Sequence, residues 1–144
     1  MIKIICPGRI KEAYLREAVE DYKKRISKYH KIQIIEVDDS TIEEEKKIIL
    51  KYVDNKDYVI TLEIKGNSLT SEEFSEKIDK TFITNSCICF IIGGSLGLSE
   101  EVKKRSNYKL SFSSFTFPHQ LFRVILLEQI YRAFKIINNE AYHK

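Results

Sequence analysis

Three stretches of this sequence combine residue types and spacing that could take part in chemistry. The first is the glycine-rich run Gly93-Gly94-Ser95-Leu96-Gly97, which directly follows the apolar run 87–92. Glycine lets the backbone approach a ligand closely, and exposed amides favour a carboxylate or a ring nitrogen. The run matches neither the dinucleotide fingerprint nor the phosphate-binding loop, which ends in Lys-Ser or Lys-Thr. A tight turn and a ligand-binding loop are therefore both open interpretations.

The second stretch runs from Phe112 to His119, at the start of a long helical pattern. In an open parallel α/β sheet, ligands bind beyond the carboxyl ends of the strands. We expect this stretch, the glycine-rich run and the end of the apolar run 58–64 to meet there. His119 is as typical of a helix end as of a catalytic group, so both interpretations stay open.

The third stretch is 138–144, which ends in Tyr142, His143 and Lys144. A short polar segment of this kind is typical of a fraying tail. An aromatic ring, an imidazole and an amine close together could instead stack on a base and contact phosphate, as RNA recognition requires.

Several other chemistries lack their motifs. The sequence has no Gly-x-Ser-x-Gly nucleophile elbow, no His-Glu-x-x-His and no Cys and His pair at ligand spacing. The three histidines are scattered, so we expect no metal site. Cys6, Cys87 and Cys89 lie in apolar, strand-like runs, which favours reduced cysteines packed in the core.

The elements that must position these stretches alternate between strand-length apolar runs and longer helical patterns. Alternation of this kind is typical of βαβ units, and it predicts a single α/β domain over 1–144 with a mostly parallel sheet and helices on both faces. The predicted strands are 2–6, 31–37, 58–64, 87–92 and 108–113, and the predicted helices are 11–28, 40–53, 70–82, a short one from 99, and 120–138. In the first helix we expect the apolar positions Ala13 or Tyr14, Ala18, Tyr22 and Ile26 to face the core.

Helix starts and turns have their own signals. Ser40 with Glu43, and Thr70 with Glu73, fit the spacing of a capping box. Ser99 is expected to cap the short helix, because acidic residues follow it. The Gly66-Asn67 pair predicts a turn that ends the third strand.

The helix 120–138 is apolar on much more than one face. Charged residues interrupt the apolar run, which excludes a membrane helix. We therefore expect one stripe of this helix to pack on the sheet and another on a second copy of the chain in a symmetric dimer.

The composition limits the class of protein. The chain has 144 residues, 43% hydrophobic, with a formal net charge of +3. This is enough for one hydrophobic core, and the mild positive charge permits RNA binding without arguing strongly for it. The amino-terminal apolar run is too short for a signal sequence or a membrane span, so we expect a cytoplasmic protein with no membrane partner.

Three motifs occur in an order that matches a known family. They are Thr61-Leu62-Glu63-Ile64-x-Gly66, Phe90-x-Ile92-Gly93-Gly94-Ser95-x-Gly97-Leu98 and Ser111-Phe112-Ser113-x-x-Thr116-Phe117-Pro118-His119-Gln120. Together with Arg123-Val124, Glu128-Gln129-x-Tyr131-Arg132-Ala133 and Tyr142-His143-Lys144, they give a sequence that resembles the RlmH family of large-subunit ribosomal RNA methyltransferases, of the SPOUT class. The resemblance spans essentially the whole chain. Between about Val37 and Leu50 this sequence looks shorter than the family pattern.

The resemblance implies an α/β fold with a carboxyl-terminal trefoil knot, an exception to the rule that chains do not thread loops. It also implies that S-adenosylmethionine is the cofactor and that its site lies in the knot. The same resemblance implies a set of cofactor-binding residues, to which we add glycines that let the cofactor approach the backbone closely. The set is Leu62, Gly93, Gly94, Gly97, Phe112, Ser113, Ser114, Phe115, Thr116 and Phe117.

The implied substrate is pseudouridine 1915 of 23S rRNA, methylated at N3 in the assembled ribosome by a homodimer. Methyl transfer needs alignment of N3 with the methyl carbon and removal of the N3 proton. The candidate catalytic residues are His119, Arg123, Arg132, Tyr142 and His143, and the tail of one subunit is expected to meet the cofactor site of the other. For Arg132, an ion pair with Glu128 along the helix is an equally weighted alternative.

Two other classes of function stay open. One is an α/β module that binds a nucleotide or flavin without methyltransferase activity, although the motifs of such modules are missing. The other is a ribosome-binding protein with no catalytic activity.

Overall fold

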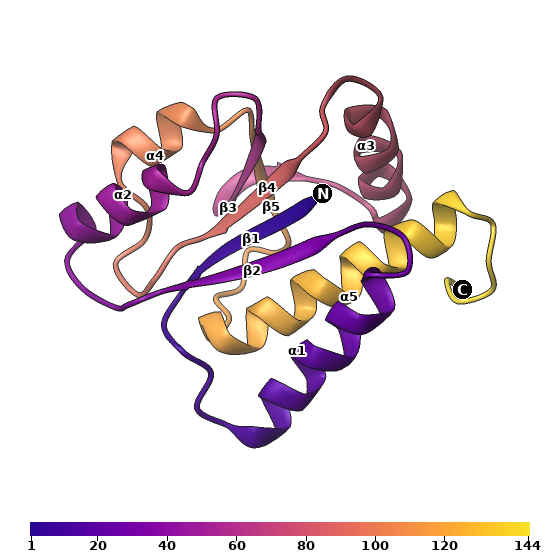
Figure 1. Cartoon of the computed structure of the whole chain (residues 1–144), viewed down its shortest axis with the longest axis horizontal. Helices are drawn as coiled ribbons and strands as arrows, with labels where there is room; N and C mark the ends of the chain where they lie inside the picture. The colour runs from indigo at the N-terminus through magenta and orange to yellow at the C-terminus, as the bar shows by residue number, and fades with distance from the viewer.

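The computed structural model describes all residues from Met1 to Lys144, and it shows one five-stranded sheet between two layers of helices (Figure 1). The strands are β1 (Ile2–Pro7), β2 (Ile32–Val37), β3 (Tyr58–Ser68), β4 (Ile88–Ile92) and β5 (Tyr108–Ser111). The helices are α1 (Ala13–Ile26), α2 (Ile42–Lys51), α3 (Ser71–Thr84), α4 (Glu100–Arg105) and α5 (His119–Ile137). The strand order is β2-β1-β4-β3-β5 and every pair is parallel. The predicted α/β fold with a parallel sheet is confirmed.

Strand β4 lies at the centre of the sheet and is buried on both faces. Ile88, Phe90 and Ile92 point into the larger core, which also contains residues of α1, α3 and α5. Cys89 and Ile91 point into a smaller core with residues of α2 and α4. The alternation follows from the two-residue period of a strand, and it explains why one short run needs apolar side chains at every position.

Helix α1 faces the core with only part of the predicted set of residues. Leu15, Val19 and Ile26 are buried and Tyr22 packs against the core, whereas Tyr14 is 69% exposed. The prediction was thus correct for Tyr22 and Ile26 and wrong for Tyr14. The helix begins at Ala13 rather than Lys11, and small or aromatic residues on its flanks obscured the apolar stripe.

The helix caps agree with the sequence at two of three sites. Thr70 and Glu73 form the predicted capping box of α3, and Ser99 caps α4 by accepting a hydrogen bond from the backbone N–H of Val102. The prediction for α2 was wrong by one residue. Thr41, not Ser40, caps α2, since its hydroxyl accepts from the N–H of Glu44 at 3.2 Å.

The Gly66-Asn67 pair does not end β3. The strand continues to Ser68, and both Leu62 and Asn67 pair with Leu110, so residues 63–66 bulge away from β5. Gly66 is required at the bulge, because a Cβ there would lie 2.8 Å from backbone atoms of Lys109. The fifth strand ends at Ser111 rather than residue 113, so residues 112–118 form the loop that connects β5 to α5.

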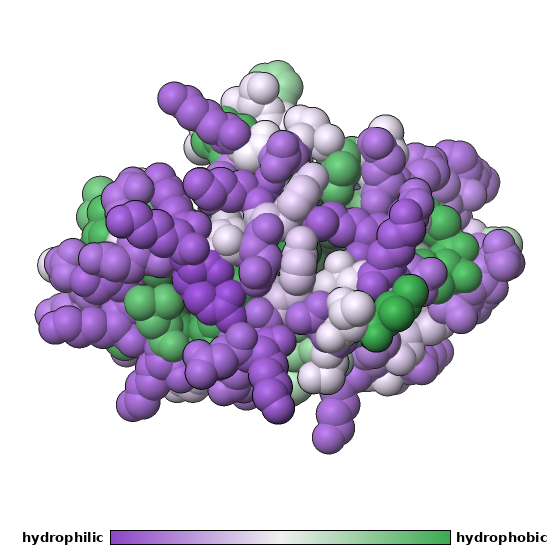
Figure 2. Space-filling model, turned by 90° about the horizontal axis from the view of Figure 1, so that it is seen from above, coloured by the Kyte–Doolittle hydropathy of each residue, from purple (hydrophilic) through white to green (hydrophobic).

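Most of the broad apolar surface of α5 is covered by other elements of the same subunit. The helix packs on the sheet and lies between α1 and α3, which cover its two sides (Figure 1). A second subunit is therefore not needed to explain most of its apolar residues, although Leu121 stays 40% exposed. Hydrophilic side chains predominate on the face in Figure 2, where apolar side chains form separate patches. None of the helices has the length and apolar character needed to cross a bilayer.

A buried ion pair joins β1 to the residue before β3. Lys3 Nζ donates to Asp57 Oδ2 at 2.8 Å and to the carbonyl of Tyr52 at 2.8 Å, and both charged side chains are almost completely buried. Burial by itself raises the pKa of Asp57, but the hydrogen bond and charge of Lys3 outweigh it and lower the pKa below 3.8.

This pair predicts a pH dependence of stability. Because the pKa of Asp57 is lowered by folding, its contribution is present above pH 3.8 and is lost as the pH falls through the folded pKa. We expect Asp57→Asn to lower the free energy of unfolding by about 3 kcal/mol at pH 7, with the difference from wild type vanishing in strong acid. Urea unfolding measured from pH 7 to pH 2 checks this.

The control for this experiment is Asp21→Asn, which breaks the exposed pair between Asp21 and Arg25. We expect a loss of less than about 1 kcal/mol for the control. If the free energies of unfolding of wild type and Asp57→Asn differed by the same amount at every pH, the stabilising role of the Lys3–Asp57 ion pair would be contradicted.

Candidate functional site

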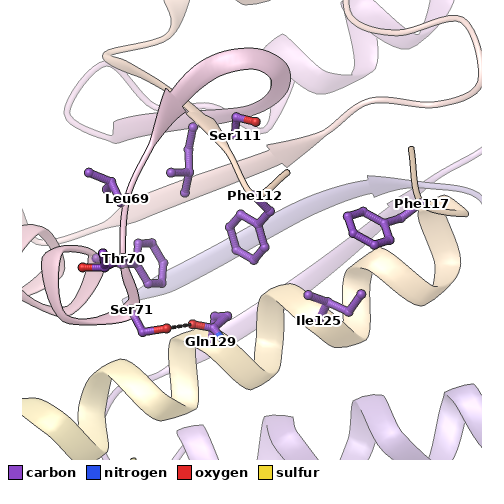
Figure 3. A pocket seen from close by; sticks show the side chains of 10 residues that line it. Leu69, Thr70, Ser71, Ser111, Phe112, Phe117, Ile125 and Gln129 are labelled. Atoms are coloured by element: carbon purple, nitrogen blue, oxygen red, sulfur yellow. Dashed lines mark hydrogen bonds between the residues drawn. The ribbon is translucent and has the colours of Figure 1, made fainter. Parts of the chain in front are cut away.

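A cavity of about 290 Å³ opens near the carboxyl ends of β3 and β5 (Figure 3). Its wall is built by the β3–α3 connection, the end of β5, the loop after β5 and the middle of α5. The lining residues are Leu69, Thr70, Ser71, Phe74, Leu110, Ser111, Phe112, Phe117, Ile125 and Gln129. The wall is thus mainly apolar, with a few hydroxyl groups and one amide, as is typical of small-molecule sites.

Aromatic contacts hold the loop after β5 against the core. The Phe112 ring lies edge-on to Phe74 and to Phe122, at 6.3 and 5.1 Å between centroids, and Phe117 stacks on Phe122 at 5.9 Å. Phe112 and Phe117 both face the cavity in Figure 3. Between them the chain runs outward, and Phe115 is 79% exposed.

The glycine-rich run follows β4, the strand next to β3, and forms a tight turn. The N–H of Gly97 donates to the carbonyl of Gly94 at 3.0 Å, and Gly97 has a φ of +80°, which favours glycine. The run therefore forms a turn, and its contact with a ligand stays a prediction. Leu62 connects the two regions, because it pairs with Ile92 on one side and with Leu110 on the other.

Two carboxylates that the sequence analysis did not single out lie against this turn. A Cβ at Gly94 would lie 3.3 Å from Glu45 Oε1 and 3.6 Å from Asp39 Oδ1, so the absence of a side chain makes room for both groups. Glu45 is buried. Burial and the charge of Asp39 raise the pKa of Glu45. A capping pattern near Ser40 was the only sequence signal in this region.

His119 and Arg123 lie at the end of β1, one turn apart on α5. The Nδ1 atom of His119 is buried without a hydrogen-bond partner, and its ring lies near Gly8. Arg123 is 1% exposed, and its guanidinium donates to Glu36 at 2.7 Å and to the carbonyls of Pro7 and Gly8 at 2.9 and 3.1 Å. In this position Arg123 ties α5 to the ends of β1 and β2.

Arg132, Tyr142 and His143 form a second group at the other end of α5. Arg132 makes the expected ion pair with Glu128, at 2.6 Å, and also contacts Nδ1 of His143 at 3.0 Å. The Tyr142 ring lies edge-on to Tyr131, and burial together with Glu128 raises the pKa of Tyr142 to about 12. The segment 138–144 thus packs on its own subunit.

The five candidate catalytic residues therefore do not share one place. His119 and Arg132 are 13 positions apart on one helix, which separates them by about 20 Å along its axis. The cavity residues Ile125 and Gln129 lie on α5 between the two groups. Within one subunit the structure does not bring all five residues to a single reacting atom.

The cofactor residues implied by the resemblance divide in the same way. Phe112 and Phe117 line the cavity, while Ser113, Ser114, Phe115 and Thr116 lie in the same loop outside it, and Leu62, Gly93, Gly94 and Gly97 lie on the neighbouring strand ends. The cavity residues that the sequence analysis missed are Leu69, Thr70, Ser71, Phe74, Leu110, Ser111, Ile125 and Gln129. Most of them read as ordinary core or cap residues, and only the fold shows that they surround one space.

The remaining titratable groups give little further chemistry. No group of three or more His, Cys, Asp or Glu side chains is placed to hold a metal ion. The three cysteines are free and buried, as predicted. Burial raises the pKa of Cys6 and of Cys89 to about 12, so these thiols are poor nucleophiles.

Comparison with known proteins agrees with this geometry. Residues 1–143 match a family model described as "Predicted SPOUT methyltransferase". The chain is 54% identical to the ribosomal RNA large subunit methyltransferase H of Clostridium botulinum (strain Kyoto / Type A2), with 99% of each chain covered. It is 50% identical, with the same coverage, to ribosomal RNA large subunit methyltransferase H 1 of Clostridium perfringens (strain SM101 / Type A).

A solved structure with a similar fold is that of a probable methylase family protein from Haemophilus influenzae Rd KW20. The TM-score is 0.60 at 17% identity, with 96% of this chain and 66% of that longer chain covered. At this identity the similarity concerns the fold alone.

The parallel sheet, the cavity at its carboxyl ends and the family match define a methyltransferase of the SPOUT class. Within that class, the chain belongs to the family of ribosomal RNA large subunit methyltransferase H. Family membership implies the trefoil knot. The alignments extend over 157 positions, more than the 144 residues here, so the relatives carry residues that have no counterpart in this chain. The expected place of this difference, between about Val37 and Leu50, stays a prediction.

The buried position of Arg123 predicts a large cost in stability when it is replaced. We expect Arg123→Met to lower the free energy of unfolding by about 3 kcal/mol, because Glu36 and two carbonyls lose their donor. Urea unfolding measures the loss, and Arg25→Met, which removes an exposed pair, is the matched control. Normal stability combined with lost turnover would show instead that Arg123 acts in the chemistry.

Proposed function

We propose that this chain transfers the methyl group of S-adenosylmethionine to N3 of a pseudouridine in 23S rRNA of the assembled ribosome. The observation that carries the proposal is full-length identity of 54% to a protein named ribosomal RNA large subunit methyltransferase H. The cavity supports it, because it lies at the edge of the sheet where α/β folds bind ligands.

The residues around the cavity fit the cofactor. A mainly apolar wall with two phenylalanine rings suits a purine ring, and backbone groups of the loop 112–117 can supply its hydrogen bonds. Phe112, Phe117 and Leu110 would hold the adenine, with the glycine-rich run beside the rest of the molecule. When bound, S-adenosylmethionine supplies a methyl group attached to a positively charged sulfur.

The residues of this chain must position N3 and receive its proton. A histidine nitrogen can accept a proton, and the Nδ1 of His119 has no hydrogen-bond partner, so His119 is the candidate for this role. Tyr142 suits a different role: because its pKa is raised to about 12, its hydroxyl stays protonated and donates a hydrogen bond. The guanidinium of Arg132 keeps its charge and can stabilise negative charge that develops on the base.

A homodimer would bring the two groups of candidate residues together. About 20 Å of helix separates them in one subunit, so the Arg132, Tyr142 and His143 group of one subunit would meet the cavity of the other. Exposed apolar side chains near the site, including Phe115 and Leu121, are available for such an interface. We further propose that the dimer works on ribosomes in the cytoplasm.

The decisive experiment uses purified protein, labelled S-adenosylmethionine and ribosomes from a strain that lacks its own enzyme. Mass spectrometry of the rRNA digest then locates the methyl group. Methylation at N3 of one pseudouridine in intact ribosomes supports the proposal. Binding of NAD or FMN in place of S-adenosylmethionine would favour a nucleotide-binding module, and ribosome binding without turnover would favour a non-catalytic protein.

The cavity makes a specific prediction for cofactor binding. Phe112→Ala removes an aromatic wall, and we expect the affinity for S-adenosylmethionine to fall by about tenfold or more, measured by titration calorimetry. Ile83→Ala is the matched control, since this side chain on α3 is 79% exposed and lies outside the cavity. Equal affinity of Phe112→Ala and wild type, with both proteins folded, would place the cofactor elsewhere.

A further inference from the structure

Three polar side chains gather around two glycines at the carboxyl ends of β1, β2 and β4. A Cβ at Gly8, which follows β1, would lie 3.0 Å from Asp39 Oδ2 and 3.7 Å from His119 Cε1. A Cβ at Gly94, in the glycine-rich turn, would lie 3.6 Å from Asp39 Oδ1 and 3.3 Å from Glu45 Oε1. None of these side chains lines the cavity between α3 and α5. They form a separate polar cluster on the other side of the glycine-rich turn.

Glu45 is the member of this cluster whose burial needs an explanation. It lies in the first turn of α2 together with Glu43 and Glu44, where a negative charge stabilises the start of a helix. Glu43 and Glu44 do this from the surface, whereas Glu45 is only 7% exposed and pairs with no lysine or arginine. Burial and the charge of Asp39 raise the pKa of Glu45, and the backbone N–H of Ser40 offsets part of this rise. The start of the helix therefore does not account for a buried carboxyl group.

Two other polar atoms of the cluster have unused capacity for hydrogen bonds. The Oγ atom of Ser40 and the Nδ1 atom of His119 are fully buried and have no partner. Buried polar groups nearly always have one, so two such atoms beside a buried carboxyl group indicate a place where a polar ligand binds. A carboxyl group keeps an oxygen that accepts a hydrogen bond in either protonation state. The ligand group that fits Glu45 is therefore an N–H donor.

The base in the proposed reaction carries a donor of this kind. Pseudouridine is joined to its ribose through C5, so N1 keeps a hydrogen, and only C2 separates N1 from the N3 that receives the methyl group. In uridine the ribose is attached to N1 instead. When the sugar and N3 of the two bases are superposed, the carbonyl groups coincide and C5–H of uridine takes the place of N1–H. On this edge, N1–H is thus the one hydrogen-bond donor by which the two bases differ.

The cluster lies where the methylated edge of the base has to come. Gly94 belongs to the turn that we place beside the methyl donor, and His119 is our candidate for accepting the N3 proton. Because N1 and N3 are in the same ring, the groups that contact them must be close to each other. His119 lies close enough to Glu45 to offset part of the rise in the pKa of Glu45.

We propose that Glu45 is a specificity-determining residue, which accepts a hydrogen bond from N1–H of the target base and so selects pseudouridine over uridine. The proposal rests on the proposed function, because it requires the methylated base to lie beside the glycine-rich turn. Uridine offers C5–H in place of the donor, which leaves the buried carboxyl group unpaired. A site built around such an acceptor rejects the ligand that lacks the donor.

The experiment compares two ribosome preparations that differ only at the target position. Both come from strains that lack the methyltransferase, and the strain that supplies uridine also lacks the pseudouridine synthase for this position. We measure kcat/KM with labelled S-adenosylmethionine and expect wild type to prefer pseudouridine by about tenfold or more. Glu45→Met has a similar shape but no acceptor, and its two values should agree within about twofold. Glu45→Gln keeps an accepting oxygen and should retain the preference.

The matched control is Glu44→Met, which changes the exposed neighbour in the same turn of α2 and should behave like wild type. The ratio of the two values separates recognition from folding, because damage to the structure lowers both values together. An unchanged ratio in Glu45→Met would overturn the proposal. If Glu45→Met does not fold, Gly94→Ala replaces it, since a methyl group 3.3 Å from Glu45 Oε1 obstructs the carboxyl group. Here too the preference should fall, and an unchanged ratio would overturn the proposal.

The same measurements distinguish failure of this proposal from failure of the proposed function. A wild-type protein that methylates neither preparation would reject both. A wild-type protein that methylates both preparations equally well would keep its activity as an rRNA methyltransferase and reject only the role of Glu45.

Discussion

The structure depends on one constraint, which is that every side chain of β4 must be kept from water. Ile88 to Ile92 are buried on both faces of the sheet, so helices have to cover both faces. Helices α1, α3 and α5 cover one face, and α2 and α4 cover the other. The glycine-rich turn directly follows β4. Because β4 is central and pairs with β3, the turn lies at the carboxyl ends of the strands, next to the end of β3.

The cavity follows from what happens beside this central strand. β3 lies between β4 and β5, bulges at residues 63–66 and returns to pair with Ser111. The loop after β5 must then cross to the face covered by α1, α3 and α5. Phe112 and Phe117 anchor the two ends of that crossing, and the space that remains between them, α3 and α5 is the cavity.

Much of the fold could be predicted from the sequence, because its signals are local. The strand runs, the Thr70 and Glu73 capping box and the Ser99 cap depend only on neighbouring residues, and all were correct within a few positions. Tyr14 and Ser40 were misplaced, since two adjacent residues offered the same pattern and tertiary packing chose between them. Gly66 was read as a turn because its real constraint, the backbone of β5, lies more than 40 positions away in the chain.

The site was predictable only in part for the same reason. The family motifs pointed to the glycine-rich run and to the loop 112–117. Ser71 carries no signal of its own, and Gln129, although it belongs to a family motif, was not expected to line the cavity, where it accepts a hydrogen bond from Ser71. Helices α1 and α3 take most of the apolar surface of α5, and the packing of its remaining stripe on a second subunit stays a prediction. The burial of Arg123 could not be predicted for a related reason. Its three acceptors come from the ends of β1 and β2, which are far from Arg123 in the sequence.

The parallel order of the sheet also determines how the chain must fold. Residue 2 pairs with residue 88, and residue 58 pairs with the same position of β4 from the other side. Such contacts form only after large loops have closed, and the chain loses entropy in each closure before it gains the contact. We therefore expect folding in milliseconds to seconds, slower than for small helical bundles. Until both neighbours have arrived, β4 is an exposed apolar strand with two free edges, and during that interval the chain is most prone to aggregate.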